Sequence, residues 1–195
     1  MDLVTALLVG VPQVAVFAMV PFAWWLNAGR PEGSFAGWLG FRPPKDAGAP
    51  LVVAATIIAG LGFFGGGLLS RSTAAPAGQV GYFAVLALAF VAVVATALSE
   101  ELFFRGFLLR WLGEKRTGTL VANLFQALCC GLLWLAVHWL FISRELWPCL
   151  AAFALGVGPA LIVGWLRQRT QSLLLPWAAH GLGNLVAALV GLLAR

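Results

Sequence analysis

Charge is scarce in this sequence: only 10% of its 195 residues are Asp, Glu, Lys or Arg, whereas 62% are hydrophobic. Soluble domains carry about 25% charged residues. A water-soluble fold of this length could not hide so much apolar surface, because small domains leave a large share of their surface exposed. The composition therefore excludes an ordinary soluble domain and indicates that the main solvent of the chain is lipid.

Cysteine is scarce as well. Cys129, Cys130 and Cys149 all lie inside apolar runs, and no two of them form a Cys-x-x-Cys pattern. Neither a disulfide framework nor a thiolate metal site is indicated. We expect all three cysteines to be packing residues.

Long apolar runs are abundant, and each is long enough to cross a hydrocarbon core of roughly 30 Å as a helix. All of them are expected to be helical, because lipid offers no partner to unpaired backbone groups. The first run begins with Asp2 and is too long for a secretory signal. We predict an all-α polytopic membrane protein with about six transmembrane helices, near residues 3–28, 51–70, 81–104, 120–142, 148–166 and 173–194.

These helices are expected to form one bundle, a single integral-membrane domain over residues 1–195 with a buried polar site. Its catalytic core would span about 81–194, and residues 1–80 would add two helices and a loop. That loop, residues 29–50, is rich in Gly and Pro and is predicted to hold one short interfacial helix around Trp38. The third long helix is expected to continue past the hydrocarbon, run along the headgroups and end at Gly113.

The net charge of +5 does not indicate nucleic acid, because the basic residues form no stripe. They are instead distributed unequally between alternate loops, and the richer loops are expected to face the cytoplasm. This predicts a multi-pass protein of the cell inner (plasma) membrane with both termini outside. The richer loops hold Arg30, Arg42, Lys45, Arg110, Lys115, Arg116, Arg167 and Arg169, and the other side holds Arg71, Arg144 and Arg195.

The stretch "ALSEELFFRGFLLRW" places two carboxylates near the end of the third apolar run. A charge at the centre of a membrane helix costs about 3 kcal/mol on insertion scales, so each carboxylate is expected to have a stabilising partner or a function. Glu101 and Arg105 are four residues apart on one helix face and can pair. Glu100 is turned about 100° away and has no partner on its own helix.

Other apolar runs supply polar groups that Glu100 could meet. His138 follows Trp134 by one turn in the fourth run, and His180 shares a face with Asn184 in the sixth. A carboxylate and an imidazole around a buried water form a general base with an orienting partner. An imidazole and a carboxamide can donate hydrogen bonds to a developing oxyanion. This combination suits hydrolysis of an acyl bond.

Straight helices would not bring these groups together. Counted along the helices from the cytoplasmic loops, Glu100 lies roughly 18 Å deep, His138 roughly 27 Å and His180 roughly 10 Å. Helix tilts, an in-plane turn after Arg105 or a kink at Pro176 would have to close the gap.

The polar residues just described form three motifs along the chain. Taken in order, these motifs resemble those of the CAAX proteases and bacteriocin-processing enzymes, a family of intramembrane proteases. The resemblance covers about residues 95–190. It departs from the family pattern at one position, where tryptophan replaces the usual phenylalanine at the start of the second motif. The motifs are Glu100-Glu101-x-x-x-Arg105, Trp134-x-x-x-His138 and His180-x-x-x-Asn184.

The resemblance implies an intramembrane endopeptidase that cleaves a membrane-anchored protein or peptide. By this resemblance Glu100 would activate water with help from His138. His180 and Asn184 would stabilise the oxyanion, and Trp134 would keep an aromatic packing role.

The resemblance also implies that Glu101 and Arg105 hold the site together. A zinc ion bound by Glu100, His138 and His180 is an open alternative, because two imidazoles and a carboxylate are acceptable ligands at a catalytic zinc site. The metal-free glutamic mechanism is favoured, since the spacing lacks the compact His-Glu-x-x-His arrangement of soluble zinc proteases.

Two further functions are considered from the residues. Carboxylates and histidines in membrane helices also serve as proton relays, so a proton-coupled transporter is an alternative. The other is a non-catalytic member of the same fold that acts by binding, for example in self-immunity. The expected partners are a membrane-anchored substrate and the lipid bilayer, without nucleic acid.

Overall fold

The computed structural model describes residues 2–30, 33–70, 81–115 and 118–194, and within these ranges every regular element is a helix. Six helices are long and apolar enough to cross a membrane, so the predicted all-α membrane fold is confirmed. Their outer faces carry many exposed aliphatic and aromatic side chains, as lipid contact requires. The spans are α1 (Leu3–Asn27), α3 (Pro50–Leu69), the composite helix Tyr82–Glu114, α6 (Thr119–Phe141), α7 (Leu146–Thr170) and α8 (Leu174–Leu193).

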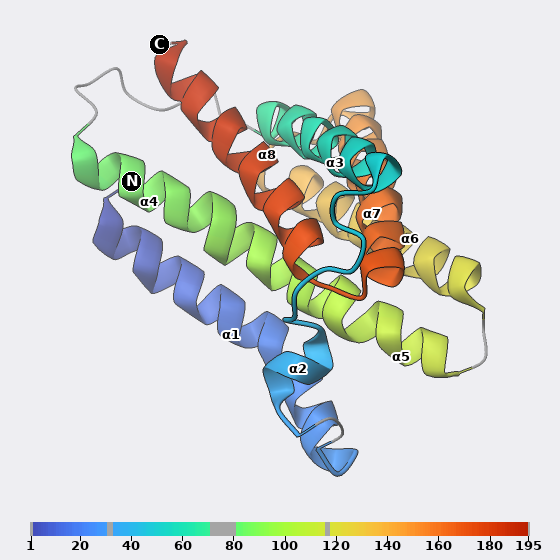
Figure 1. Cartoon of the computed structure of the whole chain (residues 1–195). Coiled ribbons are helices and arrows are strands. Elements are labelled where there is room, and N and C mark those ends of the chain that lie inside the picture. The colour runs from blue at the N-terminus through green and yellow to red at the C-terminus, as the bar shows by residue number, and fades with distance from the viewer. Residues whose placement is uncertain (1, 31–32, 71–80, 116–117, 195) are drawn as a thin grey trace.

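The composite helix differs from its prediction. It consists of α4 (Tyr82–Ala89), η1 (Phe90–Leu98), η2 (Glu101–Leu108) and α5 (Leu109–Glu114), where η1 and η2 have the wider π-helical hydrogen bonding. Figure 1 shows α4 to α5 continuing in one direction, so the helix makes no in-plane turn after Arg105, one of the three ways considered to bring the site together. The helix also passes through Gly113 and ends at Glu114. Its 33 residues would span about 50 Å, more than the hydrocarbon core, so it must tilt or protrude.

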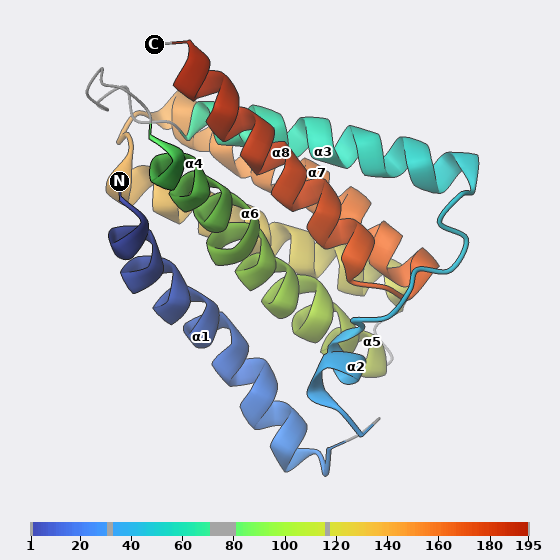
Figure 2. The same ribbon diagram turned by 60° about the vertical axis from the view of Figure 1, so that its left-hand side comes forward.

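The helices pack in a closed order that surrounds the composite helix on three sides (Figures 1 and 2). α1 lies against η1 and η2, and α8 lies against η1 on another side. α8 then packs on α3, α3 on α7 and α7 on α6, which returns to η2 and α5. Polar groups of the composite helix therefore face neighbouring helices instead of lipid.

The short helix predicted around Trp38 is confirmed as α2 (Phe35–Leu39). The Ser34 hydroxyl caps its N-terminus by accepting from the backbone N–H of Gly37, and Gly40 ends it in the left-handed conformation with φ of 97°. The Trp38 side chain is buried in an apolar cluster. The carbonyl of Gly40 accepts from the N–H of Leu173, which ties this loop to the start of α8.

The start of α1 and the end of α8 lie at the same end of the bundle, and the ends of α1, α5 and α7, where the basic loops begin, lie at the other (Figures 1 and 2). Arg71, Arg116 and Arg195 fall outside the described residues. Which end faces the cytoplasm stays a prediction of the positive-inside rule.

Candidate active site

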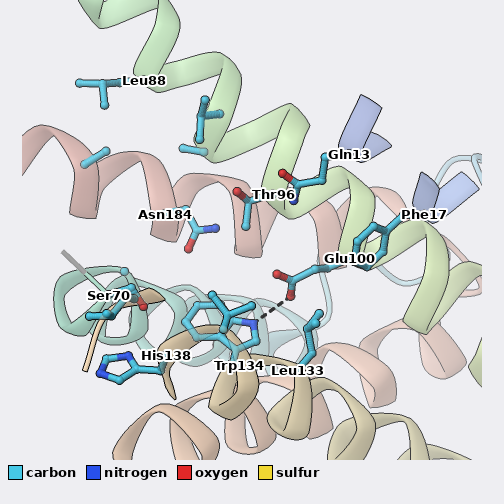
Figure 3. Close-up of a pocket in the computed structure, with 16 residues that line it drawn as sticks. Gln13, Phe17, Ser70, Leu88, Thr96, Glu100, Leu133, Trp134, His138 and Asn184 are labelled. Carbon is cyan, nitrogen blue, oxygen red and sulfur yellow. Dashed lines mark hydrogen bonds between the residues drawn. The ribbon is translucent and has the colours of Figure 1, made fainter. Parts of the chain in front are cut away.

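A cavity of about 580 Å³ lies between α1, α3, the composite helix, α6 and α8 (Figure 3). Most of its surface is apolar, with a few polar side chains directed into it, which is the usual character of a small-molecule or peptide site. The polar lining residues are Gln13, Ser70, Thr96, Glu100, Trp134, His138 and Asn184, and the apolar ones are Phe17, Gly67, Leu88, Val91, Ala92, Leu133, Val137, Ile142 and Ala188.

Glu100 lies at the junction between η1 and η2, where its side chain enters the cavity. It is only 5% exposed. Its Oε2 accepts a hydrogen bond of 3.0 Å from the indole Nε1 of Trp134 and lies 3.7 Å from the Sγ of Cys130. π-helical turns are often found at functional sites, because the wider turn changes the direction in which a side chain points. This carboxylate is therefore buried and held at the cavity wall.

Sequence reasoning missed the donor role of Trp134 and the contact of Cys130. We assigned Trp134 only an aromatic packing role and treated Cys130 as a packing residue. The signal for the first was present, because tryptophan carries an N–H that the family's usual phenylalanine lacks. Nothing in the sequence indicated the contact between Cys130 and Glu100.

The second carboxylate, Glu101, is fully buried and faces away from the cavity. Its Oε1 lies 3.2 Å from the Nη1 of Arg105, the pair that the four-residue spacing predicted. The same oxygen lies 3.0 Å from the Nδ1 of His180. Arg105 also reaches the Sγ of Cys130 at 4.0 Å. A buried chain of polar groups thus joins the composite helix to α6 and α8.

His180 is held firmly but does not line the cavity. Its ring stacks on Phe63 of α3, with ring centroids 3.8 Å apart and an interplanar angle of 10°. Its Nε2 is buried and has no hydrogen-bond partner among the described residues. Asn184, one turn later on α8, does line the cavity, and Figure 3 shows its amide nitrogen on the side of Glu100.

His138 lines the cavity further along α6 and is almost fully buried. Figure 3 shows its imidazole turned away from the Glu100 carboxylate, with the Trp134 side chain between them. Glu100 and His138 form no hydrogen bond with each other. Trp134, one turn before His138 on α6, donates to the Glu100 carboxylate instead. The cavity thus brings together Glu100, Trp134, His138 and Asn184, whereas His180 joins the site only through Glu101 and its neighbour Asn184.

Residues 82–186 match the family described as type II CAAX prenyl endopeptidase Rce1-like, which is just over half of the chain. The chain belongs to this Rce1-like family. No curated protein and no solved structure matches it.

The match runs from the start of α4 to the second half of α8, so it contains Glu100, Trp134, His138, His180 and Asn184. Membership supports a CAAX-type intramembrane protease, and the earlier resemblance is confirmed. The bilayer is accordingly the environment of this Rce1-like protein, and a peptide is its class of substrate.

The zinc alternative requires three ligands around one point. Glu100 and His138 share the cavity without contact, and the Nδ1 of His180 is directed to Glu101. Across the described ranges, no three His, Cys, Asp or Glu side chains gather closely enough to hold a metal ion. Glu100, His138 and His180 do not meet at one point in this conformation, and the choice between the metal-free and the zinc mechanism stays a prediction.

The cavity extends from Glu100 toward one end of the bundle. Its outer lining includes Ser70 just after α3, Ile142 just after α6 and Leu88 of α4. The ends of α3 and α6 and the start of α4 lie at the same end of the bundle as the start of α1 and the end of α8 (Figures 1 and 2). In this Rce1-like protein the cavity therefore extends away from the basic loops.

Proposed function

We propose that the chain is an endopeptidase of the glutamic type that hydrolyses a peptide bond of a membrane-anchored protein or peptide. The observation that carries the proposal is the Glu100 carboxylate, buried at the wall of a largely apolar cavity that also presents His138 and Asn184. A general base needs a fixed position and limited access to bulk water, and this environment supplies both.

In the proposed reaction, a water molecule beside Glu100 attacks the carbonyl carbon of the scissile bond. Glu100 takes one proton from that water as the new C–O bond forms, and the carbonyl electrons move to the oxygen. When the tetrahedral intermediate collapses, the C–N bond breaks and the leaving nitrogen receives the proton that Glu100 holds. Water is consumed, and no co-reactant is needed.

The oxyanion needs donors placed where its charge develops. The amide of Asn184 is on the cavity wall and would donate directly. His180 is the proposed second donor through its unpartnered Nε2. That role requires the ring to carry both protons, because its Nδ1–H donates to Glu101 at the same time.

Trp134 and His138 would assist Glu100 in different ways. The indole N–H of Trp134 holds the carboxylate in place at 3.0 Å. His138 has a buried Nδ1 without a partner in the described structure, and it would hydrogen-bond to the water or to the substrate backbone within the cavity. The help that His138 gives to Glu100 is then indirect.

Glu100→Gln tests this proposal, because it keeps the shape of the side chain and an acceptor for Trp134 but removes the base. Cleavage should fall by about 10²- to 10⁴-fold, the usual contribution of a general base, while the amount of folded protein stays the same. Membrane proteomes of cells that contain the unaltered protein or the variant should differ in the membrane-anchored proteins that remain uncleaved.

Glu114→Gln is the matched control, since Glu114 lies on the same composite helix but is exposed at its end. It should leave cleavage unchanged. Undiminished cleavage by Glu100→Gln would contradict the proposal. Loss of solute transport without any effect on peptides would instead favour the transporter alternative, and no effect of either kind would favour a binding protein.

A further inference from the structure

A second, smaller pocket of about 190 Å³ lies at the end of the bundle that carries the basic loops. It is separated from the active-site cavity, since the two share no lining residue. None of the described residues that line it is a carboxylate. They are Arg105, Leu109, Arg110, Gly113, Thr119, Arg167, Gln168 and Gln171.

Arg105 forms the floor of this pocket and is fully buried. One guanidinium nitrogen, Nη1, pairs with the Glu101 carboxylate and donates to the Sγ of Cys130. The other two, Nε and Nη2, are buried and have no hydrogen-bond partner among the described residues. Unsatisfied N–H groups of a buried cation are costly, so they indicate a missing acceptor.

Two more guanidinium groups reach the same pocket from different helices. Arg167 of α7 is 8% exposed and donates from Nη2 to the carbonyl of Leu39 at 3.2 Å. Arg110 of α5 donates from Nη1 to the carbonyl of Trp38 at 2.7 Å, and its Nε lies 3.0 Å from Glu114. With Glu101 and Glu114 counted against the three arginines, the surroundings retain one positive charge.

The start of α6 adds to this positive potential. Thr119 is the first residue of this 23-residue helix. The backbone N–H groups in the first turn of a helix have no partners within the helix and carry a partial positive charge. Gln168 fixes the position of this end by donating to the carbonyl of Thr119 at 2.8 Å. A helix N-terminus beside arginines is suited to a phosphate oxygen.

The location of the pocket suggests where the phosphate comes from. Trp38 and Trp111 lie nearby, with Arg110 over the ring of Trp38 and Lys115 over that of Trp111. Tryptophan and basic side chains together are typical of the headgroup level of a bilayer.

We infer that this pocket binds a phosphate group between Arg105, Arg110 and Arg167 at the start of α6. The phosphate belongs either to an anionic lipid headgroup or to a free phosphate ion. The phosphate oxygens accept from the Nε and Nη2 of Arg105, and the pocket then links bound phosphate to the Glu101–His180 pair through the other face of the same guanidinium.

Binding can be measured directly on the purified full chain. Thermal unfolding in detergent with increasing inorganic phosphate tests the free ion, and native mass spectrometry after incubation with phosphatidylglycerol tests the lipid. Phosphatidylcholine, with no net charge, is the lipid control. A stability gain with inorganic phosphate identifies free phosphate, and retention of phosphatidylglycerol over phosphatidylcholine identifies the lipid.

Arg167→Gln should weaken the observed binding by about 10- to 100-fold, as expected for the loss of a charged hydrogen-bond donor. Arg169→Gln is the matched control, because Arg169 is on the same helix, carries the same charge and pairs with Asp46 outside the pocket. It should bind as the unaltered protein does.

Gln171→Glu provides a second test that removes no arginine contact. It adds a carboxylate to the exposed rim of the pocket and should weaken binding by repulsion. No response to either phosphate source, or equal binding by the Arg167 and Arg169 variants, would overturn the inference. These readouts do not involve peptide cleavage, so their failure would leave the proposed protease function untouched.

Discussion

Replacement of the buried carboxylate Glu101 by glutamine is expected to destabilise the bundle strongly. Glu101 is fully buried and accepts from both Arg105 and His180 through one oxygen. Glutamine keeps the size of the side chain but removes its charge. Arg105 would then remain in the protein interior without a carboxylate partner.

The size of the effect follows from burial. Removing one partner of a buried ion pair costs about 3–5 kcal/mol, because the other charge stays desolvated. The composite helix contains a second pair with the same four-residue spacing, Arg110 and Glu114, whose side chains are 21% and 53% exposed. Exposed pairs contribute about 0–1 kcal/mol, so Glu114→Gln should have little effect.

Thermal unfolding in one detergent measures this difference. With about 2–4 °C per kcal/mol for a chain of this length, Glu101→Gln should lower the Tm by about 6–20 °C and Glu114→Gln by less than about 4 °C. Adding Arg105→Met to Glu101→Gln should recover part of the loss, because no buried charge is then left unpaired. Equal Tm values for the two single variants would refute the argument that burial decides the strength of these pairs.

Two other expectations can be tested with the same material. Gly183→Ala should lower the Tm, since its Cβ would lie 2.5 Å from the carbonyl oxygen of Gly60 on α3, whereas Gly158→Ala on α7 meets nothing within 4 Å and should not. Exhaustive chelation should leave cleavage unchanged, because Glu100 and His138 do not gather with a third ligand; loss of activity restored by zinc would contradict this.

The six spans were predictable because lipid imposes a minimum helix length and forbids unpaired backbone. Five of them begin and end within about four residues of the expected positions. The composite helix continues beyond its apolar span, as expected, and ends at Glu114, one residue after the expected Gly113. What the sequence did not predict is that its C-terminal part packs against α2 through Phe107. A short-range pattern cannot show that a loop about 70 residues earlier folds back to cover such a segment.

The polar site was predictable only within each helix. Four-residue spacing is enough to pair Glu101 with Arg105, because both side chains lie on one turn. Contacts between helices depend on tilt and rotation, which the sequence does not specify. Two contacts between helices were missed for this reason. Glu101 also contacts His180, and Glu100 accepts from Trp134 instead of meeting His138, which lies one turn later.

Arg105 lines the smaller pocket and also pairs with Glu101, and this position would give the second motif carboxylate a positioning role. Its Nη1 holds Glu101, which orients His180 one turn before Asn184 on the active-site wall. Its Nε and Nη2 have no partner among the described residues and would donate to the proposed phosphate. A cation with acceptors on both sides is fixed in position, whereas one with acceptors on a single side can rotate. The geometry of the proposed oxyanion donors would then depend on phosphate at the basic end of the bundle, although the active-site cavity extends toward the opposite end.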